Sequence, residues 1–170
     1  MREYVTEALV LGKEPLRAAD GRYHFFTRRF GKMAGKATSS RKITSKLAGH
    51  LEPGSFANVR FVERNSGTGG SAQIADALQY GKAAAPPRDL ELLWRVLAEG
   101  EADEALWQEV SRFGASPSWT AMLAFLGWDP REAGCAACSR GAPAAFLIPR
   151  QEFFCNACAS KLERDDLILM

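Results

Sequence analysis

The chain has 170 residues, of which 46% are hydrophobic and 25% are charged, a balance typical of a soluble globular protein with one core or two small ones. No apolar run approaches the roughly 18 residues that a membrane span needs, and Glu3 and Glu7 at the start argue against a signal peptide. We therefore expect a cytoplasmic protein whose cysteines stay reduced.

Charge is distributed unevenly along the chain. Residues 1–82 carry 14 Lys and Arg against 7 Asp and Glu, a net charge of +7. Residues 83–170 carry 8 against 13, a net charge of −5. Such an asymmetry indicates that the N-terminal half meets a polyanion.

The first 80 residues are predicted to be rich in β-strands. Strands are expected at 4–11, 22–28, 33–38, 55–63 and 71–77, with a basic loop or one helical turn over 39–49 and a glycine-rich turn over 65–70. In 55–63 the apolar Ala57, Val59 and Phe61 alternate with Asn58 and Arg60, which is typical of a half-buried strand. Five short strands with glycine-marked turns favour a small closed barrel of the OB type over 1–80.

A linker rich in Ala and Pro is expected over 81–87, and the hydrophobic period then changes to that of a helix. Apolar side chains recur at helical spacing in three runs: Leu90, Leu93, Trp94 and Leu97; Leu106, Val110 and Phe113; and Trp119, Met122, Leu123 and Leu126. Ser116 and Pro117 predict the start of the third helix, and Gly127 predicts its end. We expect a helical segment over 88–132, whose Trp-rich faces either pack together or form a groove for a partner peptide.

The four cysteines form two pairs, Cys135 with Cys138 and Cys155 with Cys158, and 16 residues separate the pairs. Two-residue spacers let both thiolates of a pair reach one ion, so two pairs complete a tetrahedron. We therefore predict one structural Zn²⁺ in a Cys₄ module over 133–170, which includes the C-terminal tail. Two redox-active pairs are the alternative. The expected fold class is α+β: an N-terminal five-stranded OB-fold barrel, a short helical segment and a C-terminal Cys₄ zinc module.

A basic stretch without any acidic residue runs between Asp20 and Glu52. Its cations are the predicted nucleic-acid contacts: Arg22, Arg28, Arg29, Lys32, Lys36, Arg41, Lys42 and Lys46. Basic side chains neutralise phosphates, and the interleaved Tyr23, Phe25, Phe26 and Phe30 include candidates for stacking on unpaired bases. Because neighbours on a strand face opposite sides, Phe25 and Phe26 cannot both line one core. A solvated charged face is the alternative.

Signals of catalysis are weak. The glycines near residues 67–70 do not form a phosphate-binding loop, and neither His24 nor His50 has the sequence context of a nucleobase deaminase. A closed Cys₄ site also leaves no open position for substrate. We therefore expect no catalytic residues and no enzymatic activity.

The chain resembles the RecO family of recombination mediators over nearly its whole length. ALVLGKEPLRAADGRYHFFTRRFGKMAGKATSSRK and SKLAGHLEPGSF are similar to the family's OB domain, with Lys36 to Lys46 at its basic loop. MLAFLGWDPREAGCAAC resembles the family's helix, its Leu-Gly-aromatic-x-Pro turn and its first zinc knuckle, and the second cysteine pair follows in order.

The resemblance implies a bacterial DNA repair protein of the cytosol or nucleoid. Such proteins bind single- and double-stranded DNA, anneal complementary strands, and load the recombinase together with RecR and commonly with single-strand-binding protein. Only twelve residues follow Cys158, where the family usually continues with further helices, so this chain is expected to be a short member. That difference puts the binding of single-strand-binding protein in question.

Two other functions fit the residues. The first is a zinc-containing OB protein that binds RNA, because composition and charge do not separate DNA from RNA. The second is a scaffold whose Trp-rich helices bind a protein, with a basic face that only increases solubility.

Overall fold

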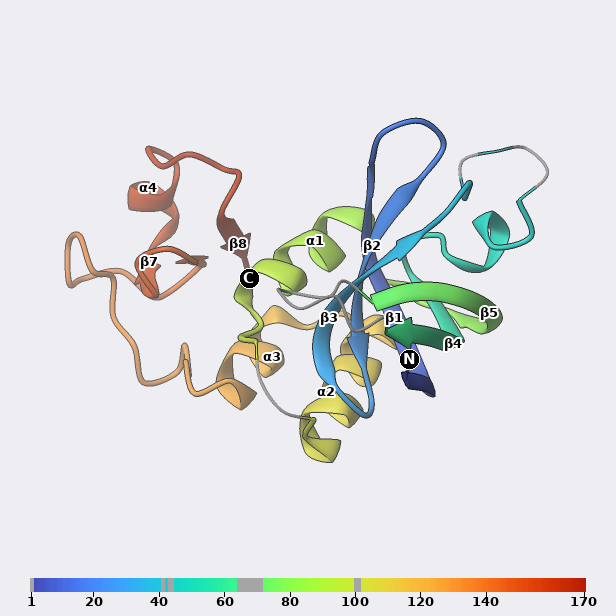
Figure 1. Cartoon of the computed structure of the whole chain (residues 1–170). Coiled ribbons are helices and arrows are strands. Elements are labelled where there is room, and N and C mark those ends of the chain that lie inside the picture. Colours follow the sequence, from blue (N-terminus) through green and yellow to red (C-terminus); the bar gives the residue numbers. More distant parts are fainter. Residues whose placement is uncertain (1, 41, 43–44, 64–71, 100–101) are drawn as a thin grey trace. The chain divides into compact units, whose positions relative to one another are not determined.

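The structure is a computed structural model that describes residues 2–40, 42, 45–63, 72–99 and 102–170 (Figure 1). Two compact units make up the chain, Met1–Ser116 and Pro117–Met170. The expected helical segment contributes two helices to the first unit and one helix to the second. The predicted α+β class is confirmed, whereas the expected segment boundaries stay predictions.

Five strands form a closed barrel in the first unit. They are β1 (Arg2–Pro15), β2 (Gly21–Thr27), β3 (Gly31–Ala37), β4 (Ser55–Glu63) and β5 (Ala72–Lys82), in the order β1-β2-β3-β5-β4. Strands β1 to β3 form an antiparallel meander, and β3 closes the barrel against β5 through a short parallel pairing. This is the arrangement of a five-stranded OB fold, as predicted.

The strand boundaries differ from the predicted ones mainly in β1, which extends beyond the predicted 4–11 at both ends, and in β5. This strand continues through Gly81 and Lys82, which the sequence places in the linker, because they pair with Phe56 and Ser55 of β4. Pairing along the whole of β4 thus outweighs the weak strand propensity of the Gly-Lys pair. The predicted glycine-rich turn over 65–70 lies outside the described residues, as does Ser71.

The barrel interior is filled by alternate side chains of the strands. Phe25 and Phe61 meet edge to face, with ring centroids 5.4 Å apart, among smaller side chains such as Val10, Val59 and Ile74. Each strand therefore has one face inside the barrel and one face outside, as the period of two predicts.

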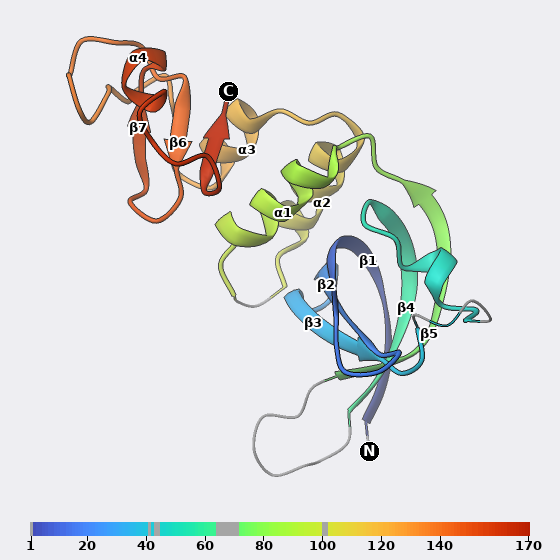
Figure 2. The same cartoon turned by 90° about the horizontal axis from the view of Figure 1, so that it is seen from above.

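A second core lies on the outer side of β1 and β2. Helices α1 (Pro87–Val96) and α2 (Glu104–Ala115) pack there, as Figure 2 shows, and a short 3₁₀ helix, η1 (Ala48–His50), precedes β4. The ring of Phe26 faces outward and stacks on Trp107, with centroids 6.4 Å apart. Phe25 and Phe26 thus belong to different cores, as predicted.

The close approach of α2 to the barrel depends on a small residue. A Cβ atom at Gly114 would lie 2.9 Å from Cζ of Phe56 and 3.4 Å from Cδ2 of Leu9. The carbonyl oxygen of Gly114 also accepts the backbone amides of Ala84 and Ala85, at 2.8 and 3.1 Å. The segment between β5 and α1 is therefore tied to the end of α2.

The second unit contains two helices and one small sheet. They are α3 (Trp119–Phe125), β6 (Ala145–Leu147), β7 (Glu152–Phe154), α4 (Asn156–Ala159) and β8 (Leu167–Leu169), with the strands in the antiparallel order β7-β6-β8. The predicted start of α3 is wrong. Ser118 is its N-cap and accepts the amide of Ala121, whereas Ser116 is the C-cap of α2. Gly127, at φ +95°, follows the end of α3 as predicted.

No helix of the described residues is long and apolar enough to cross a membrane.

Candidate nucleic-acid interface and metal centre

The outer surface of β2 and β3 is the face with which OB folds usually bind oligonucleotides. Cross-strand partners on this face are Arg22 with Lys36, and Phe26 with Lys32. Helix α1 covers the middle of it: the ring of Trp94 lies on His24, with centroids 4.4 Å apart and planes 7° apart. Only the end that carries Arg22 and Lys36 stays exposed on both strands.

Lys32 is used by the fold. Its Nζ donates to the carbonyl oxygen of Leu97 at 2.8 Å and lies 4.4 Å from the centroid of the Trp94 ring. Partial burial lowers the pKa of Lys32 below its ordinary value. Its position suits the attachment of α1 better than contact with a phosphate.

Arg28, in the turn between β2 and β3, is also engaged. Its Nε and Nη2 donate to the carboxylate of Glu104 on α2 at 2.9 Å, and its Nη1 donates to Glu7 at 2.6 Å. These hydrogen bonds raise the pKa of Arg28 above its ordinary value. The neighbouring Arg29 is exposed, with its guanidinium carbon 5.4 Å from the centroid of the Phe30 ring.

The remaining described cations of the basic stretch lie toward the other end of β2 and β3. Arg22 contacts Glu14 at 3.3 Å, and Lys36 contacts Asp20 at 2.9 Å. The pKa of Asp20 is lowered first by the hydrogen bond from Lys36, and the charge of Lys42 adds to the effect. Arg22 and Lys36 therefore share this end with Lys42.

The exposure of the basic loop varies from residue to residue. Lys42 and Lys46 are exposed, and no hydrogen bond or ion pair within the described part of the chain engages either amine. Arg41 lies outside the described residues. The structure thus brings Arg22, Lys36 and Lys42 together, whereas Arg28 and Lys32 contact the helices.

A pocket of about 600 Å³ lies beside this loop, and the sequence did not reveal it. Its walls include Tyr23, Ser40 and Lys42, together with Lys13, whose Nζ lies 2.6 Å from Glu52 Oε2. No sequence signal links Lys13 with Glu52, because they meet only when the loop folds back against β1.

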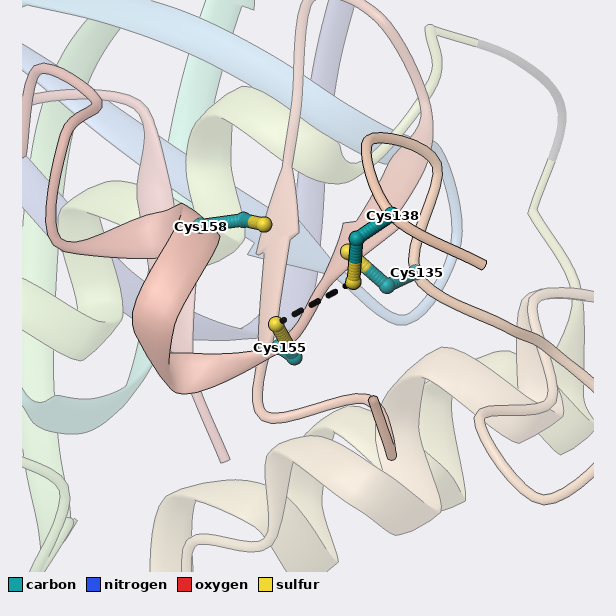
Figure 3. Close-up of side chains that lie close together, drawn as sticks. All are labelled: Cys135, Cys138, Cys155 and Cys158. Carbon is teal, nitrogen blue, oxygen red and sulfur yellow. Dashed lines mark hydrogen bonds between the residues drawn. The ribbon is translucent and has the colours of Figure 1, made fainter. Parts of the chain in front are cut away.

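In the second unit the four cysteine side chains converge on one point (Figure 3). All four sulfurs lie within 4.8 Å of one another, and Sγ of Cys138 is 3.8 Å from Sγ of Cys155. Thiolates at about 2.3 Å from one tetrahedral Zn²⁺ would be about 3.8 Å apart, whereas a disulfide needs about 2.05 Å. The spacing fits a metal site and not a disulfide.

Backbone amides near the cluster favour the thiolate form of Cys135. Amides of Cys155, Cys138 and Ala137 act on the sulfur of Cys135 and lower its pKa to about 6. Hydrogen bonds with the sulfurs of Cys155 and Cys135 raise the pKa of Cys158 to about 12. Four thiolates this close repel one another, so a cation is needed for all four to ionise.

Gly141 lies directly against the second cysteine pair. A Cβ atom there would be 2.3 Å from Cβ and 2.9 Å from Sγ of Cys155. One residue from each strand of the small sheet packs in the same buried cluster as the cysteines: Ala145 of β6, Phe154 of β7 and Leu167 of β8. The sequence predicted the four ligands but not the sheet that supports them, because its strands have three residues each.

Residues 1–80, which span the barrel up to Tyr80, match the family model described as Recombination protein O N terminal. The barrel is a RecO N-terminal domain. The RecO domain supports a general role in DNA repair and recombination, a role that implies DNA binding and contact with recombination proteins. The cysteine cluster that follows the RecO barrel is able to bind a metal ion.

Proposed function

We propose that this protein is a recombination mediator of the RecO family in the bacterial cytosol, without enzymatic activity. It binds single- and double-stranded DNA, anneals complementary strands, and loads the recombinase together with RecR. The observation that supports this most is the partly covered OB face. Helix α1 occupies its middle, and the exposed end carries Arg22 and Lys36 beside Lys42.

The eight candidate cations divide into two groups in this proposal. Arg22, Arg29, Lys36, Lys42 and Lys46 are exposed or bound only by surface ion pairs, which are weak and readily exchanged for a phosphate. Arg41, which lies outside the described residues, is a proposed contact on the basis of the sequence alone. Arg28 and Lys32 act mainly in attaching α1 and α2 to the barrel, so their removal should affect stability before DNA affinity.

The metal in this proposal is one structural Zn²⁺ bound by Cys135, Cys138, Cys155 and Cys158. A shell of four thiolates leaves no position for water or substrate, so the ion would stabilise the second unit and not take part in chemistry. Single-strand-binding protein is a further candidate partner.

The salt dependence of binding to a single-stranded DNA oligomer tests the DNA-binding surface. The logarithm of the affinity should fall linearly with the logarithm of salt concentration, by about 0.7 per phosphate contact. Replacing Lys42 and Lys46 together by Ala should lower the affinity and reduce this slope by about 1.4.

Arg60→Ala is the matched control, because Arg60 lies on β4 at another side of the barrel and pairs with Glu3 at 2.9 Å. It should leave the slope unchanged. An RNA oligomer of the same sequence that binds far more tightly would favour the RNA-binding alternative. If the protein does not bind DNA at low salt, the protein-scaffold alternative is favoured instead. The proposed annealing of DNA strands would then be excluded as well.

A further inference from the structure

The pocket beside the basic loop has the size of a ligand site. Its volume of about 600 Å³ lies within the range of about 300–1,000 Å³ that small-molecule pockets occupy. The end of β1 lines it with Pro15, β2 lines it with Gly21 and Tyr23, and the connection from β3 to β4 lines it with Ser40, Lys42 and Ala48. Pro15 leads into the β1–β2 loop, which is one of the loops with which OB folds bind oligonucleotides.

One polar group in the wall has no partner within the described residues. Ser40 is only 2% exposed, and its hydroxyl oxygen makes no hydrogen bond there. A buried hydroxyl without a partner is costly, and a native protein usually satisfies it with water or with a ligand. Gly21 contributes to this wall, since a Cβ there would lie 2.9 Å from Ser40 Oγ.

The charges around the pocket are balanced within the protein, with one exception. Glu52 is paired with Lys13 at 2.6 Å, and Glu14 lies 3.3 Å from Arg22 and 3.4 Å from His24. Lys42 is exposed, and no ion pair to a described residue engages its amine. A ligand for this pocket should therefore be neutral and partly apolar, with hydrogen-bonding groups at its edge and a negative charge close by.

An unpaired nucleobase with its phosphate has that chemistry. We propose that the pocket takes one unpaired base of the bound strand, with the Ser40 hydroxyl at the edge of the base and Lys42 beside its phosphate. This inference rests on the proposed DNA-binding function. The bases of a duplex are stacked and paired, so the pocket favours single-stranded over double-stranded DNA.

Filling the pocket tests the inference. Ala48→Phe places a ring in the pocket. Gly49→Phe adds the same ring at the neighbouring residue, which does not line the pocket and where nothing lies within 4 Å of the new Cβ. Ala48→Phe should weaken binding of a single-stranded oligomer about 5- to 100-fold and leave duplex affinity within about twofold of wild type. Gly49→Phe should change neither affinity.

Ser40→Ala gives a second, milder variant. It should weaken single-strand binding about fivefold without lowering the temperature of unfolding, because it removes a hydroxyl that has no partner in the described residues. An oligomer of abasic deoxyribose phosphates should bind wild type more weakly than the normal oligomer, and Ala48→Phe should narrow that difference.

The outcomes separate the two proposals. If wild type does not bind single-stranded DNA at low salt, the proposed function itself is overturned. If wild type binds but Ala48→Phe and Gly49→Phe bind equally well, or lose single-strand and duplex affinity alike, only the base pocket is overturned. If Ala48→Phe does not fold, an unchanged single-strand affinity in Ser40→Ala overturns it.

Discussion

The indole of Trp94 lies flat on the imidazole of His24, with ring centroids 4.4 Å apart and planes 7° apart. The ammonium of Lys32 lies over the same indole at 4.4 Å. One side chain of α1 thus covers two polar residues in the middle of the OB face. This contact attaches the helix to the barrel and separates the end with Arg22 and Lys36 from the turn that carries Arg29.

Removing this indole should loosen α1 from the barrel. We expect Trp94→Ala to lower the free energy of unfolding by about 2 kcal/mol, less than for a fully buried tryptophan because Trp94 is half-buried. Trp94→Phe keeps an aromatic face for His24 and Lys32, so its free energy of unfolding should fall by less than that of Trp94→Ala. Urea unfolding of the three proteins measures the difference, and equal midpoints for wild type and Trp94→Ala would rule the contact out as an attachment.

The ion pairs of Arg28 should make the stability of the first unit depend on acid. The hydrogen bond from Arg28 lowers the pKa of Glu104 below its ordinary value of 4.5. Because the folded carboxyl has the lower pKa, its contribution is complete above about pH 4.5 and is lost as the pH falls through the lowered value.

Glu104→Gln should therefore be less stable than wild type at pH 7, and the gap should close as the pH falls below 4.5. Thermal unfolding of both proteins from pH 7 to pH 3 measures this difference in stability. The control is Glu163→Gln at an exposed position, which should be as stable as wild type at every pH. A gap that widens in acid would contradict the assignment of this carboxylate to Arg28.

Metal removal should unfold the second unit selectively. Its small sheet has strands of three residues, so we expect its stability to depend on the metal ion that we propose for the four cysteines. A strong chelator, or Cys138→Ser, should release about one Zn²⁺ per chain and abolish the unfolding transition of residues 117–170. Ser139→Ala should keep the metal. Metal analysis by mass spectrometry checks both, and a metal-free wild type with an intact second unit would contradict the site.

Gly141 should be needed for metal affinity although it offers no ligand atom. A methyl group there would lie 2.3 Å from Cβ of Cys155 and force this cysteine out of place. We expect Gly141→Ala to weaken metal binding at least tenfold in competition with a chromogenic chelator. Gly134→Ala is the matched control, since nothing lies within 4 Å of a Cβ at that position, and equal affinities would show that Cys155 adapts.

Much of the fold was predictable because its signals are local. The alternation in 55–63 predicts β4 residue for residue, and the helical spacing of Leu90, Leu93 and Leu97 predicts α1. The spacing of the two cysteine pairs predicts four sulfurs that the structure places within 4.8 Å. The start of α3 was missed because Ser116 and Ser118 both suit an N-cap, and only the backbone path decides between them.

The sequence by itself predicted the five barrel strands, the three longer helices and four cysteines as candidate metal ligands, because the pattern behind each strand, helix and cysteine pair is local. It also determined that the N-terminal half is basic. Only the tertiary structure decided which of the basic residues are free. Arg28 meets Glu104, Lys32 meets Trp94, and Ser40 comes to line a pocket through contacts between distant segments. Whether a charge is free to bind a phosphate depends on its neighbours in space, and their distances are not encoded by local periodicity.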